Sequence, residues 1–375
     1  MKYLAILGRQ PEISIAELKA LGWTADPADS SPFQKFLTDV KIFSGSLPES
    51  SPAVDIDRLG GTMKLAIELG NKPLEYLKDL PEGKITIGIS DYSKQATRKT
   101  ASSEALKLKK ILTRQGRSVR VVENHEAELS TATSLHNGLS GKNERKVELI
   151  KTDEGWYRVV GIQDIEAYAR RDQKRPARDA KVGMLPPKLA QILINLCGPL
   201  KQNVTILDPF CGTGVVLQEA LLMGYKAYGT DISERMIEYS KKNLEYFKFN
   251  NYDLEVGDAV THKWQKKIDA VACEGYLGKP FSKIPTEMDL KKQKQECGSI
   301  ILGFLKNLAS QIKSDTPVVM AIPAWLREDG SYERLKILDE IEKLGYNIDN
   351  KSREGLVYRR EGQIVARDII ILRKK

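Results

Sequence analysis

Val204-Thr-Ile-Leu-Asp-Pro-Phe-Cys-Gly-Thr-Gly214 is the stretch of sequence that decides the fold. Its first four residues have the composition of a buried strand, and a glycine-rich turn follows Asp208. Apolar residues then recur at helical spacing as far as Gly224, a residue type that commonly ends helices. Glycine at positions 212 and 214 lets a ligand approach the backbone where a side chain would block it. The stretch therefore predicts a strand, a tight turn and a helix in succession.

A second acid lies at a position that nucleotide-binding folds use. Lys226–Thr230 predicts the next strand, and Asp231 follows it directly. An acid at the tip of the second strand of a βαβ unit is placed to accept hydrogen bonds from two ribose hydroxyls. Leu217 stands where a dinucleotide fingerprint needs its third glycine, and the Gly-Lys-Ser/Thr run of a P-loop does not occur. A nucleotide site of another kind is predicted, and a glycine-rich turn that binds nothing is the alternative.

The pattern that remains resembles the S-adenosylmethionine site of class I methyltransferases. The form Asp-Pro-Phe-x-Gly-x-Gly is the one found in enzymes that methylate amino groups. The resemblance implies S-adenosylmethionine as the cofactor. It also implies that the cofactor is bound by residues of the turn, of the successive strand tips and of the preceding helix start. These residues are Asp208, Phe210, Gly212, Gly214, Asp231, Ile232, Asp258, Ala259 and Pro187.

Composition narrows the class of protein. The chain has 375 residues, of which 29% are charged, with a net charge of +9 and a pI near 9.1. A basic balance favours a polyanionic partner. The four cysteines form no Cys-x-x-Cys pair and only three histidines occur, so we expect no metal site and a reduced, cytoplasmic environment. No segment is apolar over the length of a membrane span, so we expect no membrane partner.

The order of predicted elements indicates an α/β protein with two kinds of architecture. Residues 186–375 repeat βα units, which predicts a doubly wound, Rossmann-like sheet with its ligand at the carboxyl ends of the strands. Residues 1–75 and 76–167 mix strands and helices and predict two smaller α+β regions. Residues 168–185 are polar, basic and interrupted by proline, so they are predicted to be a linker.

Two further helices are expected from local patterns. Leu59–Leu69 begins with a Gly-Gly pair and continues with apolar residues, which predicts a glycine turn that leads into a helix. Tyr332–Leu344 is also expected to be a helix. Both expectations rest on composition rather than on cap residues.

Basic residues are concentrated between Asp91 and Arg120, a segment that contains nine Lys or Arg residues and only two acids. The helix predicted over 103–115 turns Leu108, Ile111 and Leu112 toward a core and leaves Lys107 and Lys110 in water. A charged helix face is usually only a solvated face. The alternative is a surface that follows RNA phosphates, with an affinity that falls steeply with salt.

The whole chain resembles one family, the THUMP-containing tRNA guanine-N2 methyltransferases that modify guanosine at position ten. The resemblance is carried by Leu59–Lys64, Leu129–Asn137, Arg175–Asp179, Gly183–Lys188 and Asp208–Gly214. In that family the THUMP region grips the 3′ end of the acceptor stem, and this grip selects the nucleotide that reaches the active site. The resemblance therefore implies a ferredoxin-like region in residues 1–75, a THUMP-like region in 76–167, and tRNA as the partner. RNA contacts are then expected at Lys107, Lys110, Arg114, Arg170, Arg171 and Arg175.

The chain departs from the family's pattern where the chemistry takes place. Amino methyltransferases carry Asp/Asn-Pro-Pro-Tyr after the fourth strand, and the corresponding run here is Cys273-Glu-Gly-Tyr-Leu-Gly278. A purine amine is a weak nucleophile, so its protons must be held by acceptors while its lone pair faces the methyl group. The resemblance gives the acceptor roles to Glu274 and the Gly275 carbonyl. Tyr276 would stack on the base, one place earlier than usual.

These observations predict a monomeric, cytoplasmic enzyme that methylates the N2 amine of a tRNA guanosine without a metal. Two alternatives stay open. One is an rRNA or DNA amino methyltransferase. The other is a tRNA-binding protein without catalysis, in which the loop after Cys273 has lost its chemistry.

Overall fold

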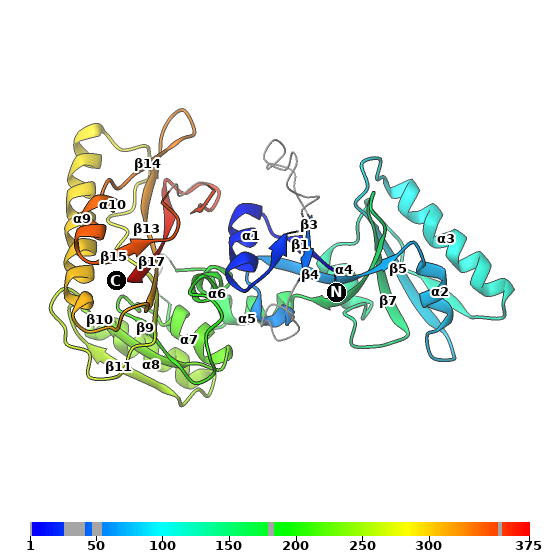
Figure 1. Cartoon of the computed structure of the whole chain (residues 1–375), viewed down its shortest axis with the longest axis horizontal. Helices are drawn as coiled ribbons and strands as arrows, with labels where there is room; N and C mark the ends of the chain where they lie inside the picture. Colours follow the sequence, from blue (N-terminus) through cyan, green and yellow to red (C-terminus); the bar gives the residue numbers. More distant parts are fainter. Residues whose placement is uncertain (1, 26–41, 47–54, 179–183, 352–354) are drawn as a thin grey trace. The chain divides into compact units, whose positions relative to one another are not determined.

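The computed structural model describes residues 2–25, 42–46, 55–178, 184–351 and 355–375. Contacts divide the chain into two compact units, Met1–Tyr168 and Ala169–Lys375. Figure 1 labels the helices and strands of both. The protein is of the α/β type, with a mixed sheet in the N-terminal unit and a Rossmann-like sheet in the C-terminal unit.

A single sheet runs through the described part of the N-terminal unit. Across the sheet, its eight strands are β2 (Thr24–Ala25), β3 (Ile42–Ser46), β1 (Lys2–Leu7), β4 (Thr62–Gly70), β8 (Trp156–Ile162), β7 (Lys146–Lys151), β5 (Ile85–Asp91) and β6 (Val119–Val121). Strand β5 is parallel to β6 and β7, and the other pairs are antiparallel. Because β4 pairs with β8, the sheet continues across the predicted boundary at residue 75, and that boundary stays a prediction.

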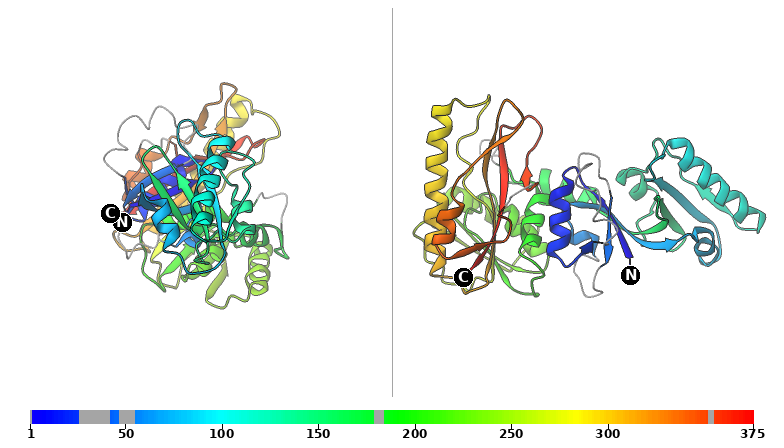
Figure 2. Two further views of the ribbon diagram at one scale, coloured as in Figure 1. Left: turned by 90° about the vertical axis from the view of Figure 1, so that its right-hand side faces the viewer. Right: turned by 45° about the horizontal axis from the view of Figure 1, so that its top comes forward.

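Helices flank this sheet. They are α1 (Pro11–Ala20), the 3₁₀ helix η4 (Ile56–Arg58), α2 (Pro73–Lys78), α3 (Arg98–Arg114), α4 (Thr131–His136) and, at the junction with the second unit, α5 (Ile165–Gln173). Figure 2 shows α3, drawn in cyan, at the periphery of the unit. Its buried face consists of Ala101, Ala105, Leu108 and Leu112. Ile111, which was expected in the core, lies beside this stripe and is 38% exposed.

The helix predicted over Leu59–Leu69 is wrong, because most of this segment forms strand β4. The strand pairs with β1 on one side and with β8 on the other. Leu65 and Ala66 point to opposite faces of the sheet, and both are fully buried. Packing on two faces and hydrogen bonding on two edges outweigh the helical tendency of this sequence.

A buried ion pair fastens α4 to the sheet. Lys64 of β4 donates to Glu148 of β7 at 2.5 Å, and both side chains are at most 2% exposed. The same ammonium group donates to the Ser134 hydroxyl at 2.9 Å and to the Leu129 carbonyl at 2.8 Å. Ser90 donates to Glu148 at 2.6 Å. The start of α4 is therefore held by charge as well as by packing.

The C-terminal unit contains the predicted doubly wound sheet. Within the described residues its main path runs β11 (Tyr252–Val256), β10 (Lys226–Asp231), β9 (Thr205–Asp208), β12 (Ala270–Glu274), β13 (Pro317–Leu326), β17 (Val365–Lys374) and β15 (Tyr346–Ile348). The first five strands are parallel, and β17 is antiparallel to its neighbours. Strand β14 (Tyr332–Arg334) adds to β13, and β16 (Val357–Tyr358) adds to β17. The strand order reverses between β9 and β12, and ligands bind at such a point in open α/β sheets.

Helices cover both faces of this second sheet. They are α6 (Pro187–Leu196), α7 (Val215–Leu222), α8 (Glu234–Tyr246), α9 (Glu287–Ala309) and α10 (Leu338–Lys343). Figure 1 shows α9 and α10 on one face and α6 and α7 on the other. The helix predicted over 332–344 is therefore only partly right, since its first residues are strand β14. In the described ranges, no helix is long and apolar enough to cross a membrane.

The predicted linker, 168–185, is partly helical, since α5 continues to Gln173. Its residues 179–183 lie outside the described residues, and so do Asp179 and Gly183 of the two linker motifs. The stretch that follows α5 is hydrogen-bonded to helix α8 of the second unit. Asn243 of α8 donates to the carbonyls of Ala177 and Thr213, both at 2.9 Å, and accepts from the Ala177 amide at 3.0 Å.

Candidate active site

Three carboxylates meet where the parallel strands end. Asp208 ends β9, Asp231 ends β10 and Glu274 ends β12, and these strands are neighbours in the order β10, β9, β12. Asp208 is 2% exposed and accepts a hydrogen bond from the Phe210 amide at 3.1 Å. Burial raises the pKa of Asp208 well above its usual value, and the charges of Asp231 and Glu274 add to the rise. Asp208 therefore keeps its proton more readily than an aspartate exposed to water does.

The two glycines of the turn have left-handed backbone conformations, and they differ in the space beside them. Gly212 and Gly214 both have positive φ angles, of 51° and 81°. A Cβ on Gly214 would lie 2.9 Å from the Ser240 hydroxyl, so this glycine is required for packing. A Cβ on Gly212 would meet only the Phe210 carbonyl oxygen, at 3.9 Å. Open space in front of Gly212 fits a ligand that approaches the backbone there.

Asp231 connects the turn to the next helix. One carboxylate oxygen accepts from the Gly212 amide at 3.0 Å, and the other accepts from the Ser233 amide at 2.9 Å. Each oxygen keeps a further lone pair, so the group can also accept two hydroxyl groups. Ile232 beside it is 72% exposed and so is not part of the core.

The remaining residues predicted to bind the cofactor surround this turn. Asp258 is exposed and accepts from the Val260 amide at 3.0 Å, while Ala259 is 4% exposed. Pro187 is buried at the first position of α6. Phe210 packs edge-on against Phe304, with ring centroids 5.3 Å apart. These contacts show how the four residues pack and not what they bind, so their roles in cofactor binding stay predictions.

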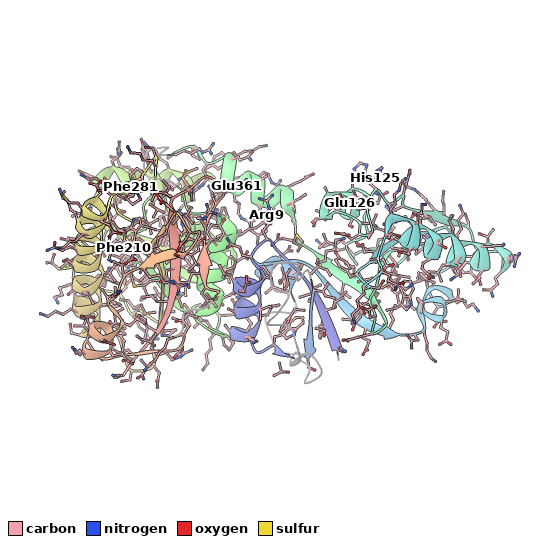
Figure 3. All side chains as sticks on the ribbon, turned by 90° about the horizontal axis from the view of Figure 1, so that it is seen from above. Arg9, His125, Glu126, Phe210, Phe281 and Glu361 are labelled. Atoms are coloured by element: carbon pink, nitrogen blue, oxygen red, sulfur yellow. The ribbon has the colours of Figure 1, made fainter. Side chains whose placement is uncertain are left out.

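The loop that begins with Glu274 is fixed at several points. The Gly275 amide donates to the Ala321 carbonyl at 2.9 Å. Tyr276 donates its hydroxyl to Glu296 at 3.0 Å; burial and then this hydrogen bond raise the pKa of Tyr276 to about 12. The Tyr276 ring and the Phe281 ring pack against the same core as Phe210, and Figure 3 labels both phenylalanines.

Arg367 of β17 was not predicted as a site residue. Its Nε donates to Glu274 Oε1 at 2.6 Å, and the arginine side chain is 5% exposed. Glu296 was missed as well. The local signal for Arg367 is an Arg-Asp pair next to the apolar run Ile369–Leu372, where charges are unexpected.

The six predicted RNA contacts fall into two groups. Lys107, Lys110 and Arg114 are exposed on α3, and Arg170 is exposed on α5. The other two, Arg171 and Arg175, make contacts within the C-terminal unit. Arg171 donates to the fully buried Glu219 of α7 at 2.9 Å. Arg175 is 3% exposed, and its contacts include the Thr213 hydroxyl at 3.4 Å.

The placement of Arg171 and Arg175 corrects the sequence-based expectation for these two residues. Both guanidinium groups face the turn-bearing part of their own unit, and burial lowers the pKa of Arg175. Arg175 is buried away from a phosphate, and Arg171 is turned toward Glu219 by its ion pair. The expectation of RNA contact therefore remains for Lys107, Lys110, Arg114 and Arg170.

Comparison with family models shows which class of domain the C-terminal unit resembles. Residues 200–341 match a model described as a methyltransferase domain, and residues 62–242 match one described as a DNA methylase. Together with the strand order and the turn, the first match defines the C-terminal unit as a Rossmann-like domain of the methyltransferase type.

Individual relatives narrow the comparison. The chain is 33% identical over 144 residues to the tRNA (guanine(10)-N2)-dimethyltransferase of Methanothermobacter thermautotrophicus, which covers 38% of this chain and 40% of that protein. It is 44% identical over 103 residues to the protein of the same name from Pyrococcus abyssi, covering 28% of this chain and 27% of the relative. The aligned segments thus span less than half the length of these relatives. The resemblance to the tRNA guanine-N2 methyltransferases is confirmed by these matches.

Among solved structures, TrmN from Thermus thermophilus aligns over 100% of both chains, with a TM-score of 0.47 and 16% sequence identity.

Proposed function

We propose that this protein transfers a methyl group from S-adenosylmethionine to the N2 amine of a guanosine in tRNA, at the position that corresponds to guanosine 10. The observation that supports this most directly is the arrangement at the switch point of the sheet. An open glycine turn, the Asp231 carboxylate and the Glu274 carboxylate all lie at the ends of adjacent strands. The names of the relatives supply the substrate class.

The residues at the turn fit the cofactor. Asp231 would accept the two ribose hydroxyls, and the open side of Gly212 would face the amino acid part. Phe210 and Ile232 would contact the apolar portions, with Asp258 and Ala259 near the adenine. When bound, S-adenosylmethionine would supply an electrophilic methyl carbon to the amine nitrogen, with its sulfur as the leaving group.

The loop after β12 would hold the target amine. Glu274 would accept a hydrogen bond from one N–H of the amine and the Gly275 carbonyl would accept one from the other N–H, so that the nitrogen lone pair faces the methyl group. After methyl transfer, the surplus proton passes to the carboxylate of Glu274. The hydrogen bond to Glu296 fixes the Tyr276 ring in place to stack on the guanine.

Asp231→Ala is expected to weaken S-adenosylmethionine binding by at least tenfold. The substitution removes the acceptor for the ribose, so that two ribose hydroxyls are left unpaired in the complex. Each unpaired group costs about 1–3 kcal/mol, and about 1.4 kcal/mol corresponds to tenfold in affinity. Isothermal calorimetry on the full chain measures this. Asp253→Ala, which removes an exposed aspartate of β11 paired with Lys266, is the matched control and should bind as the parent does. Equal affinities for all three proteins would refute the cofactor site.

Helix α3 is proposed to contact the phosphates of tRNA. In a Lys107→Glu, Lys110→Glu variant, tRNA affinity should fall, and the slope of log affinity against log salt should become shallower by about one for each lost contact. The control variant Lys201→Glu, Lys306→Glu changes the net charge equally through exposed lysines of the C-terminal unit. Filter binding over a range of salt concentrations measures both. If the two variants have the same slope, α3 is only a solvated face.

The substrate is tested by methyl transfer in vitro. The full chain is incubated with labelled S-adenosylmethionine and either a tRNA transcript with guanosine at position 10 or the same transcript with inosine there. Inosine lacks the N2 amine, so only the guanosine transcript should be methylated, and mass spectrometry of the nucleosides should find N2-methylguanosine. A duplex DNA and an rRNA fragment are included because of the match to the DNA methylase model. Methylation of the inosine transcript would refute the assignment to N2.

A further inference from the structure

A buried arginine stands directly behind the proposed acceptor of the target amine. Arg367 donates from Nε to Glu274 Oε1 at 2.6 Å and from Nη1 to Gln363 Oε1 at 3.2 Å. The exposed fractions are 5% for the Arg367 side chain and 18% for the Glu274 side chain. The pair is therefore shielded from water on the arginine side and reaches solvent on the carboxylate side.

The register of the sheet explains how two distant residues meet. Glu274 of β12 is paired with Ala321 of β13, and Pro323 of the same strand is paired with Arg367 of β17. Paired residues share a face of the sheet, so both charged side chains lie on the face that carries the Ala321 methyl group. A small side chain at Ala321 leaves the space across β13 open, and the long arginine spans it.

The pair is poorly explained as a device for stability. Taking two charges out of water costs about as much free energy as their attraction returns, and apolar residues of similar size are often equally stable. Its position is more informative, because Glu274 ends the strand at which the sheet order reverses. In the described parts of the chain, Glu274 Oε2 has no hydrogen-bond partner, whereas Oε1 is bound to Arg367.

We infer that Arg367 is a positioning residue for methyl transfer: it fixes the Glu274 carboxylate so that Oε2 alone faces the target amine. The inference rests on the proposed function. The carboxylate can take the surplus proton, because a methylated aromatic amine that still carries its extra proton is a strong acid.

The test is a double-mutant cycle on the full chain. Arg367→Met should lower kcat for tRNA methylation by about tenfold, a part of the roughly 10²-fold scale of a positioned acid or base, and leave the KM for S-adenosylmethionine unchanged. Arg367→Lys keeps the charge without the planar fork and should recover part of the loss. In a Glu274→Gln background, Arg367→Met should change kcat less than twofold, because its effect passes through the carboxylate.

Controls separate this role from a structural one. Arg373→Met removes an arginine of the same strand that is paired with Asp349 at 3.0 Å, and its kcat should equal that of the parent. Equal losses from Arg367→Met with and without Glu274→Gln would overturn the positioning role and leave the proposed function intact. No methyl transfer by the unaltered chain would overturn both. If Arg367→Met does not fold, Gln363→Ala takes its place, since it frees Arg367 on the side away from Glu274; it should lower kcat in the parent but not in the Glu274→Gln background.

Discussion

Glu274→Ala is expected to slow tRNA methylation by about 10²-fold or more, which is the usual scale for a positioned acid or base. The substitution removes the acceptor that holds the amine and leaves the buried Arg367 without its carboxylate. Binding of S-adenosylmethionine should be unchanged, because Asp231 and the glycine turn lie on other strands. Single-turnover kinetics with saturating cofactor measure the chemical step directly.

A conservative variant and a control variant are needed to interpret the effect of Glu274→Ala. Glu274→Gln keeps an oxygen acceptor and should retain more activity than the alanine variant. Ser331→Ala alters an exposed turn of the same unit and should leave the rate unchanged. Thermal unfolding of each variant shows whether the unpaired Arg367 weakens the fold. A Glu274→Ala protein that folds and methylates at the parent rate would mean that the loop after β12 is not the active site.

Lys64→Met is expected to lower the free energy of unfolding of the N-terminal unit by about 3–5 kcal/mol. The change leaves the fully buried Glu148 without a counter-charge, and it removes the donor shared by Ser134 and the Leu129 carbonyl. Urea denaturation of the full chain, followed by a probe in the N-terminal unit, measures the loss. Lys84→Met, at an exposed lysine of the same unit, should cost less than about 0.5 kcal/mol.

A compensating variant distinguishes charge from packing. Lys64→Met combined with Glu148→Leu removes both charges and should recover most of the lost stability, because apolar pairs often replace buried ion pairs without cost. If the double variant is no more stable than Lys64→Met alone, the loss arises from packing. A cost below 1 kcal/mol for Lys64→Met would show that the pair does not hold α4.

The C-terminal unit could be predicted well because each of its βα repeats carries its own local signals. Strand, turn and helix around Asp208 are confirmed, as is the doubly wound order of the sheet. Gly224 ends its helix with a positive φ angle of 83°. Local chemistry sufficed because parallel strands joined by helices place all their carboxyl ends at one edge.

Elements that depend on distant partners could not be predicted. The segment Thr62–Gly70 has a composition that suits a helix, and only its pairing with β1 and β8 makes it a strand. The Glu274–Arg367 contact is set by the register across β13, which no local pattern encodes. Arg175 was misjudged for a related reason, because its charge suggested solvent while its burial depends on the fold around Thr213.

The pairing of β4 with β8 has a consequence for how the protein is made. The ribosome completes β4 long before β8, since Ala66 is paired with Val159. Until Ile162 has left the exit tunnel, β4 has β1 on one side and an open edge on the other, and open edges attract other strands. The nascent chain therefore closes its first sheet only when the synthesis of that unit is nearly finished. A pause in translation shortly after this point would let the sheet close before the second unit begins to emerge.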